Sequence, residues 1–261
     1  MTDVALKQRI AQQFGRHAGD YDALAQVQWL IGQQAASLLQ VSDGVLLDIG
    51  AGTGRVTTLL RRHHRRVVGL DLALGMLDYA KQQHGDTIDW LCGDAESLPL
   101  ASGQCARVFS SMVLQWSREP ETVAAEIARI LAPGGCGVVT IMTAGSFPQW
   151  QHCWRNSPAR MVGFMPASRW QQALHSVGLE VNCDIRQYTT YHLSVSEMFD
   201  SIREIGAGAV ATRDSVAPLS RSELKEFVRC YERLRDQDGR LPLTYEVSFF
   251  TFSKMEINQD A

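Results

Sequence analysis

Short apolar runs alternate with amphipathic stretches through the first half of the chain, between residues 44 and 143. The amphipathic stretches carry helical periodicity and predict helices at 54–64, 73–84 and 119–132. This alternation is typical of a parallel sheet with helices packed on its faces. We therefore expect the first half of the chain to form such a sheet.

The ends of the chain follow different patterns. Residues 4–39 are expected to be helical, with a break at 14–22, and residues 144–165 read as an irregular connection. The elements expected after it are a helix at 166–177, a strand at 179–193, helices at 195–206 and 219–236, and a strand at 244–252.

The last two helices form an insertion at 194–240, within a core domain made of 1–193 and 241–255. Ligands of open sheets lie beyond the carboxyl ends of the strands, and insertions there usually carry specificity. We expect a helical lid over the substrate; the alternative is an insertion that only packs.

Three glycines at alternate positions follow one apolar strand and its terminal acid. The acid is Asp48 and the glycines are Gly50, Gly52 and Gly54. Glycine lets the backbone turn sharply and approach a ligand closely. The next apolar run ends in Asp71, which is placed to accept hydrogen bonds from both hydroxyls of a ribose. Together, the glycine loop and Asp71 predict a site for a nucleotide-like cofactor.

The spacing and charge of this loop distinguish between cofactors. A dinucleotide site needs G-x-G-x-x-G, whereas this chain has G-x-G-x-G. An ionised Asp48 would repel a diphosphate and attract a cation. S-adenosylmethionine carries an amino group and a sulfonium but no phosphate, so the signs favour it over NAD. Alternatively, Asp48 only ties down its own loop through backbone N–H groups.

Asp94 follows a third apolar run, in a loop with the sequence G-D-A-E-S-L-P. Its carboxylate can accept a hydrogen bond from an adenine amino group, while the N–H of Ala95 meets a ring nitrogen. The alternative is that Asp94 caps a short turn. Residues 131–135, L-A-P-G-G, read as a helix stop and turn before a strand at 136–142.

These pieces in this order resemble the class I S-adenosylmethionine-dependent methyltransferases, over about residues 40–145. The resemblance implies an α/β fold: a doubly wound, Rossmann-like, mostly parallel seven-stranded sheet with an antiparallel last strand. It implies S-adenosylmethionine as cofactor and S-adenosylhomocysteine as product. The cofactor residues that it implies are Asp48, Gly50, Gly52, Gly54, Asp71, Asp94 and Ala95.

Three further stretches, at 14–21, 202–207 and 239–245, resemble the malonyl-acyl-carrier-protein O-methyltransferases of biotin synthesis. This similarity covers nearly the whole chain. It implies methylation of the free carboxylate of a malonyl thioester, so that the ester serves as a primer for elongation towards pimeloyl. The implied partner is an acyl carrier protein that carries malonyl, or malonyl-coenzyme A.

The implied reaction needs no general base, because a malonyl carboxylate is ionised at pH 7. Arg203 is the candidate cation for that carboxylate, and Tyr21 is expected to close over the site. Gln115 and Trp116 are expected to face the methyl group. Alternatively, Tyr21 only anchors the N-terminal helix, and Arg203 pairs with a glutamate on its own helix. Tyr245, in the last strand, is a further candidate or a core residue.

Composition narrows the partners and the compartment. The 261 residues carry a net charge of −3, which does not suggest nucleic acid. We find no apolar run near the roughly 20 residues of a membrane span. The six cysteines form no C-x-x-C pair, so neither a zinc site nor a disulfide framework is indicated, no metal is assigned, and a reducing cytoplasm fits best.

Asp and Glu are absent between Glu126 and Glu180, a stretch that carries four arginines. It is expected either to dock an acidic partner or to have its arginines paired with carboxylates elsewhere. Two alternative functions also remain open on sequence: a methyltransferase for small-molecule or quinone-precursor acceptors, and a binding module that uses the cofactor as an effector.

Overall fold

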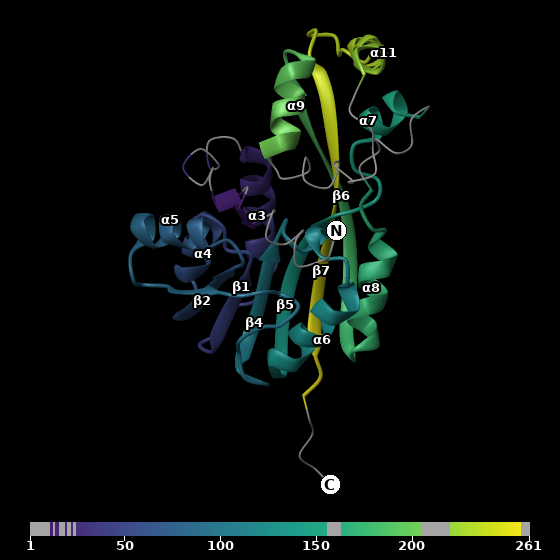
Figure 1. The fold of residues 1–261 in the computed structure, drawn as a ribbon. Coiled ribbons are helices and arrows are strands. Elements are labelled where there is room, and N and C mark those ends of the chain that lie inside the picture. The colour runs from purple at the N-terminus through teal and green to yellow at the C-terminus, as the bar shows by residue number, and fades with distance from the viewer. Residues whose placement is uncertain are drawn as a thin grey trace.

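Seven strands form one sheet in the computed structural model, in the order β3-β2-β1-β4-β5-β7-β6 (Figure 1). The first five pair in parallel, and β7 is antiparallel to both of its neighbours. The expected mostly parallel sheet with an antiparallel last strand is confirmed. The strands are β1 (Val45–Ile49), β2 (Arg66–Asp71), β3 (Asp89–Cys92), β4 (Cys105–Ser111), β5 (Leu131–Met142), β6 (Leu179–His192) and β7 (Leu241–Lys254).

The structure describes residues 11–12, 14–15, 19, 22, 25–155, 163–204 and 220–256. Parts of the expected 4–39 helical region, including residues 4–10, therefore lie outside the described residues, and the helix described in the rest of it is α3. The helices are α3 (Gln26–Leu38), α4 (Arg55–Arg61), α5 (Leu74–His84), a short 3-10 turn η1 (Leu114–Trp116), α6 (Pro120–Ile130), α7 (Pro148–Cys153), α8 (Ala167–Ser176), α9 (Val195–Glu204) and α11 (Arg221–Glu232).

Both faces of the sheet are covered, which explains why its central strands are nearly all apolar. Leu46 of β1 and Phe249 of β7 pack on the face covered by α3 and α4. Their neighbours Leu47 and Phe250 pack on the opposite face, against α6 and α8. Successive strand side chains point to opposite faces, so each strand contributes to two cores.

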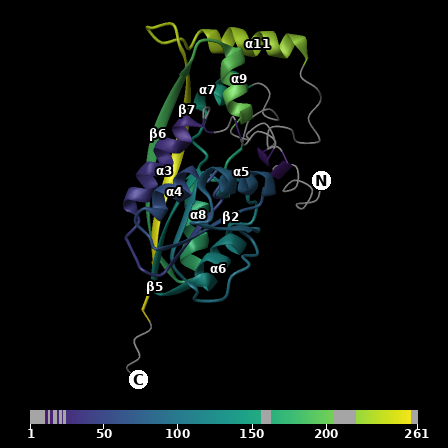
Figure 2. The same ribbon diagram turned by 90° about the vertical axis from the view of Figure 1, so that its left-hand side faces the viewer.

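The β6–β7 ribbon extends past the carboxyl edge of the parallel strands. The pairing of β5 with β7 ends at Met142 and Val247, whereas β6 and β7 stay paired to His192 and Leu241. The six extra positions of β7 span about 20 Å of extended chain. The insertion between β6 and β7 therefore starts and ends beyond the edge at which open sheets bind ligands (Figures 1 and 2).

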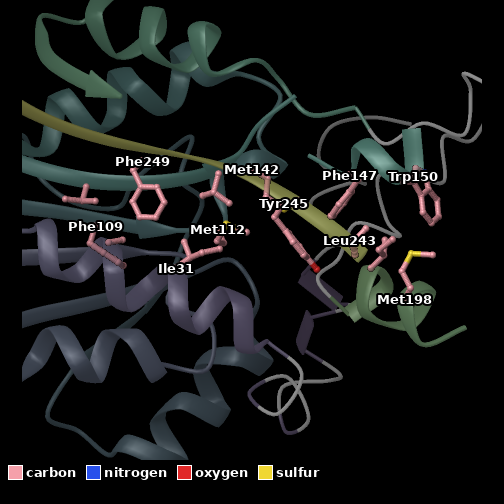
Figure 3. Packing of buried hydrophobic residues seen from close by; sticks show 14 of the residues in the cluster. Ile31, Phe109, Met112, Met142, Phe147, Trp150, Met198, Leu243, Tyr245 and Phe249 are labelled. Carbon is pink, nitrogen blue, oxygen red and sulfur yellow. The ribbon is translucent and has the colours of Figure 1, made fainter. Parts of the chain in front are cut away.

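Buried side chains form one continuous core from the sheet into the insertion. Figure 3 shows Phe249, Tyr245 and Leu243 along β7, followed by Trp150 of α7 and Met198 of α9. Tyr245 is 1% exposed, so the structure favours its interpretation as a core residue. The insertion is thus packed on the same core as the sheet.

Aromatic rings hold α7, α9 and α11 together. Trp154 stacks on Phe227 with 4.7 Å between ring centroids, and Trp150 meets Phe199 edge-on at 5.2 Å. The Tyr231 hydroxyl of α11 donates a hydrogen bond to the Pro242 carbonyl at the start of β7. Aromatic pairs of this kind add about 0.5–1.5 kcal/mol each beyond burial, so these helices form a packed platform.

One expectation about cysteine is wrong. Cys153 of α7 and Cys230 of α11 form a disulfide, with Cα atoms 5.6 Å apart and 77 positions apart in sequence. The sequence carries no signal for this pairing, because only the packing of α7 against α11 brings the two residues together.

The helices of the described part of the chain include none with the length and apolar character of a membrane span.

We predict that the non-reduced, unfolded protein alkylates at four of its six cysteines. A cross-link over a loop of this length stabilises by about 2–4 kcal/mol, so reductant should lower the free energy of unfolding by that order. Intact-mass alkylation and urea titration measure the two effects. Cys153→Ser is the matched control and should respond little to reductant; six alkylated thiols in the untreated protein would contradict the pairing.

Candidate functional site

A cavity of about 190 Å³ opens at the carboxyl ends of β1, β2 and β4. It is lined by the glycine loop after β1, by residues 93–96 and by residues 111–114 and 116–117. Five acids line it: Asp22, Asp48, Asp71, Asp94 and Glu96. Arg55 is the one Lys or Arg among the described lining residues, so the cavity favours cationic ligands over polyanionic ones.

The glycine loop needs glycine for two different reasons. Gly50 has φ 79°, and a Cβ there would lie 2.3 Å from a methyl of Val113. Gly52 has φ 55°, but a Cβ there would meet nothing within 4 Å. The first glycine thus permits close packing against the loop after β4, while the second leaves the bend open to the cavity. Gly54, with φ 80°, is the N-cap of α4.

Asp71 ties this loop to the end of the neighbouring strand. Its carboxylate accepts hydrogen bonds from the N–H of Gly52 at 2.9 Å and from the N–H of Ala73 at 2.8 Å. Burial raises the pKa of Asp71, and these N–H donors oppose that rise. Each carboxylate oxygen has two acceptor positions, so Asp71 can hold the loop and still accept from a ribose.

Asp48 is almost completely buried, with 2% of its surface exposed. The Thr57 hydroxyl donates a hydrogen bond to it at 2.6 Å. Burial raises its pKa to about 7; the Thr57 bond opposes the rise and the charge of Asp71 adds to it. Asp48 is therefore only partly ionised near neutral pH, and among the described residues Asp71, not Asp48, accepts from an N–H group of the loop.

Asp94 and Ala95, in the loop after β3, also line the cavity. Asp94 accepts a hydrogen bond from the N–H of Glu96 at 3.0 Å, which is the turn-capping geometry left open by the sequence. Glu96 in turn accepts from the Ser117 hydroxyl at 2.6 Å. The structure therefore brings Asp94 and Ala95 to the same cavity as the glycine loop.

The N-terminal segment is attached to the glycine loop at Asp22. The Thr53 hydroxyl donates to the Asp22 carboxylate at 2.7 Å, and the Arg55 guanidinium donates to its carbonyl at 3.1 Å. Arg55 also lies over the ring of Trp29 in α3, 4.2 Å from its centroid. Tyr21, predicted to close over the site, lies outside the described residues.

The loop after β4 places Trp116 on the cavity wall, whereas Gln115 is not among the described lining residues. The Gln115 side-chain amide donates to the Met112 carbonyl at 2.6 Å. Met112 itself lines the cavity with φ 58°, a conformation that costs a non-glycine residue about 1–3 kcal/mol. Backbone strain of this kind concentrates at functional sites.

Gln28 of α3 is a lining residue that the sequence analysis missed. It is 9% exposed, and neither polar atom of its amide has a hydrogen-bond partner in the described structure. A buried amide without a partner is destabilising by about 1–3 kcal/mol. The available signal was a polar residue on the apolar face of α3, one turn before Ile31 and Gly32. A ligand in the cavity can satisfy this amide.

Arg203 and the acid-free stretch are the remaining candidates. Arg203 belongs to the last turn of α9, and its side chain lies outside the described residues. Of the arginines in the acid-free stretch, Arg129 pairs with Glu126 at 2.7 Å and Arg169 with Glu121 at 2.9 Å. The described residues contain no group of three potential metal ligands.

A doubly wound sheet, a glycine bend after β1 and acids at the ends of β1 and β2 define a Rossmann-like methyltransferase. A family model described as a methyltransferase domain matches residues 47–139. The crystal structure of a putative methyltransferase from Bacillus halodurans C-125 has a TM-score of 0.63, covering 86% of this chain and 98% of its own. Its identity to this chain is 15%, so this likeness concerns the fold alone.

Two similar proteins identify the family within the methyltransferase class. The biotin biosynthesis bifunctional protein BioHC of Cellvibrio japonicus is 33% identical over 95% of this chain, which spans 50% of that longer relative. The malonyl-[acyl-carrier protein] O-methyltransferase of Herminiimonas arsenicoxydans is 31% identical over 95% of this chain and 96% of its own length. The chain belongs to the malonyl-[acyl-carrier protein] O-methyltransferase family, which makes it an S-adenosylmethionine-dependent enzyme.

We predict that cofactor binding becomes tighter as the pH rises towards 7 and levels off above it. Asp48 holds a proton below about pH 7, and the ammonium group of the ligand favours its ionised form, so binding below pH 7 must expel that proton. Calorimetry of S-adenosylhomocysteine binding in buffers of different ionisation enthalpy measures the protons released. Asp48→Asn should lose about one released proton; equal release by both proteins would contradict the assignment.

We also predict opposite effects of Gln28→Leu on stability and on binding. Removing the unpartnered buried amide should raise the free energy of unfolding by about 1 kcal/mol. Affinity for S-adenosylhomocysteine, or the KM for the acceptor, should worsen by about fivefold or more. Gln33→Leu, on the exposed face of the same helix, is the control. If Gln28→Leu leaves both ligand measurements unchanged, the amide does not contact either ligand.

Proposed function

We propose that this enzyme methylates the free carboxylate of a malonyl thioester on an acyl carrier protein, making the ester primer for the pimeloyl chain of biotin. The observation that carries the proposal is the extent of the similarity. Relatives with this printed activity align over 95% of the chain, including the insertion, and not only over the cofactor-binding residues 47–139.

The cavity fits S-adenosylmethionine better than a dinucleotide, because its described lining has five acids and one base. Bound there, the cofactor supplies a methyl group activated by its sulfonium. We assign Asp48 and the loop at Gly50, Gly52 and Gly54 to its methionine end and Asp71 to its ribose. Asp94 and Ala95 are assigned to the adenine.

The acceptor carboxylate is ionised at pH 7, so the chain does not need to remove a proton. Its task is to align the reacting groups and to exclude water from them. Trp116, Phe164 and Phe147 form an apolar group beside the cavity, with ring centroids 6.5 and 5.9 Å apart along the series. We assign Gln115 and Trp116 to the acceptor side of the site.

Arg203 is proposed to hold the malonyl carboxylate, and Tyr21 to close over it. The position of α9 supports this role for Arg203: Met198 and Ile202 anchor the helix in the core, at the carboxyl edge of the sheet. The insertion 194–240 is proposed to act as the lid, because both of its attachment points lie beyond that edge.

Mass spectrometry of malonyl-carrier protein after incubation with enzyme and S-adenosylmethionine tests the proposal. We predict the gain of one methyl group on the malonyl moiety, with slower transfer to free small acids and phenols. Asp71→Ala is the inactive control, because it removes the proposed ribose acceptor and the loop anchor together. Faster transfer to a phenol would favour the small-molecule function.

The role of Arg203 is separable from cofactor binding in the same assay. Arg203→Ala should raise the KM for malonyl-carrier protein or lower kcat, while the affinity for S-adenosylhomocysteine stays close to that of the unmodified enzyme. Arg203→Lys keeps the charge but not the planar fork of donors, and should recover part of the activity. Equal losses in acceptor and cofactor binding would mean that Arg203 is structural.

A further inference from the structure

Four basic side chains form a stripe along the outer face of α11. They recur at every fourth position and all are exposed: Arg221, Lys225, Arg229 and Arg233. Residues four apart on a helix lie on one side, one above the other. We call these four residues the α11 stripe.

The stripe faces away from the rest of the molecule. Phe227 and Tyr231 are 1% and 0% exposed and bind α11 to the aromatic platform from the opposite side of the helix. Figures 1 and 2 show α11 as an outermost element at the end of the molecule that carries the insertion. The stripe is therefore available to a partner.

None of the four has an ion pair or side-chain hydrogen bond in the described structure, which differs from the other arginines nearby. Arg235 pairs with Glu232 at 2.6 Å, and Arg240 pairs with Asp238 at 2.7 Å. Within α11 the acids are Glu223, which closes the N-terminal capping box, Glu226, which borders the stripe, and the paired Glu232. Like charges four residues apart destabilise a helix, so the stripe is not explained by the stability of α11.

The position of the stripe matches the cavity. Both β6–β7 ends of the insertion lie beyond the carboxyl edge of the sheet, and the cavity opens at that same edge. A partner bound on α11 would thus hold a flexible arm on the side of the molecule where the cavity opens. A phosphopantetheine arm is such a tether, and it carries a phosphodiester charge of its own.

We propose that the α11 stripe docks the acidic surface of the carrier protein that delivers the acceptor; this rests on the proposed function. It moves the docking surface from the acid-free stretch, where Arg129 and Arg169 are already paired, to the insertion. A net charge of −3 for the whole chain argues against nucleic acid as the partner.

The test is a double charge reversal, Lys225→Glu with Arg229→Glu. Exposed charges at an interface act mainly on association and its salt dependence, so the kcat/KM for malonyl-carrier protein should fall by about tenfold or more, chiefly through KM. The KM of the unmodified enzyme should rise with NaCl, and the reversal should flatten that dependence. The matched control is Arg62→Glu with Arg65→Glu, two exposed arginines between α4 and the amino end of β2, and it should behave as the unmodified enzyme.

A small thioester separates docking from folding and from chemistry. Malonyl-N-acetylcysteamine lacks the carrier, so both double variants should methylate it at the unmodified rate. An equal loss with both acceptors, or an unchanged kcat/KM for malonyl-carrier protein, would overturn the proposal.

Direct binding of malonyl-carrier protein, measured by fluorescence anisotropy, tests docking on the α11 stripe even if the enzyme methylates no malonyl acceptor. The charge reversal should weaken that binding by about tenfold or more, and the control should not. Binding of a single-stranded RNA of equal charge as tight as that of the carrier protein would also overturn the proposal.

Discussion

The hydrogen bond between the Gly52 N–H and the Asp71 carboxylate is the contact on which the site depends. It joins the bend after β1 to the end of β2, so neither can move without the other. The same bend is also bonded to the backbone of β2, because the N–H groups of Gly50 and Ala51 both donate to the Leu70 carbonyl. With the loop fixed from two directions, Gly52 can leave its open side to a ligand, and the acids around it keep defined positions.

Much of this arrangement is local in sequence, and that part was predictable. The glycine spacing and the acid at the end of the next strand identify β1, the bend after it and β2, since parallel strands end at one edge of a sheet. The alternating pattern near the end of the chain predicted the last two strands, and the resemblance to the methyltransferases implied that the last strand is antiparallel. The expectation that failed concerns a long-range contact, the disulfide. Cys153 and Cys230 are 77 positions apart, and no local sequence signal pairs them.

The protonation state of Asp48 was likewise not predictable from the sequence. The sequence places an acid next to the loop but does not show its burial, and burial brings its pKa to about 7. Gln28 illustrates the same limit, because an amide on the apolar side of a helix becomes informative only when the structure shows that it lacks a partner. In both cases the chemical property that matters is set by burial in the folded chain, which the local sequence does not show.

Charge is divided between two parts of one chain. Acids line the cavity, and an anion that enters it meets them at close range in a medium of low dielectric constant, where repulsion is strong. A cationic ligand reduces that repulsion, and so does the proton on Asp48. The basic residues of α11 stand outside the cavity, where they attract an anionic partner without neutralising the acids within. In the proposed function, separating the two signs by the length of the β6–β7 ribbon lets one protein of nearly balanced charge select a cation in its cavity and an acidic partner on its surface.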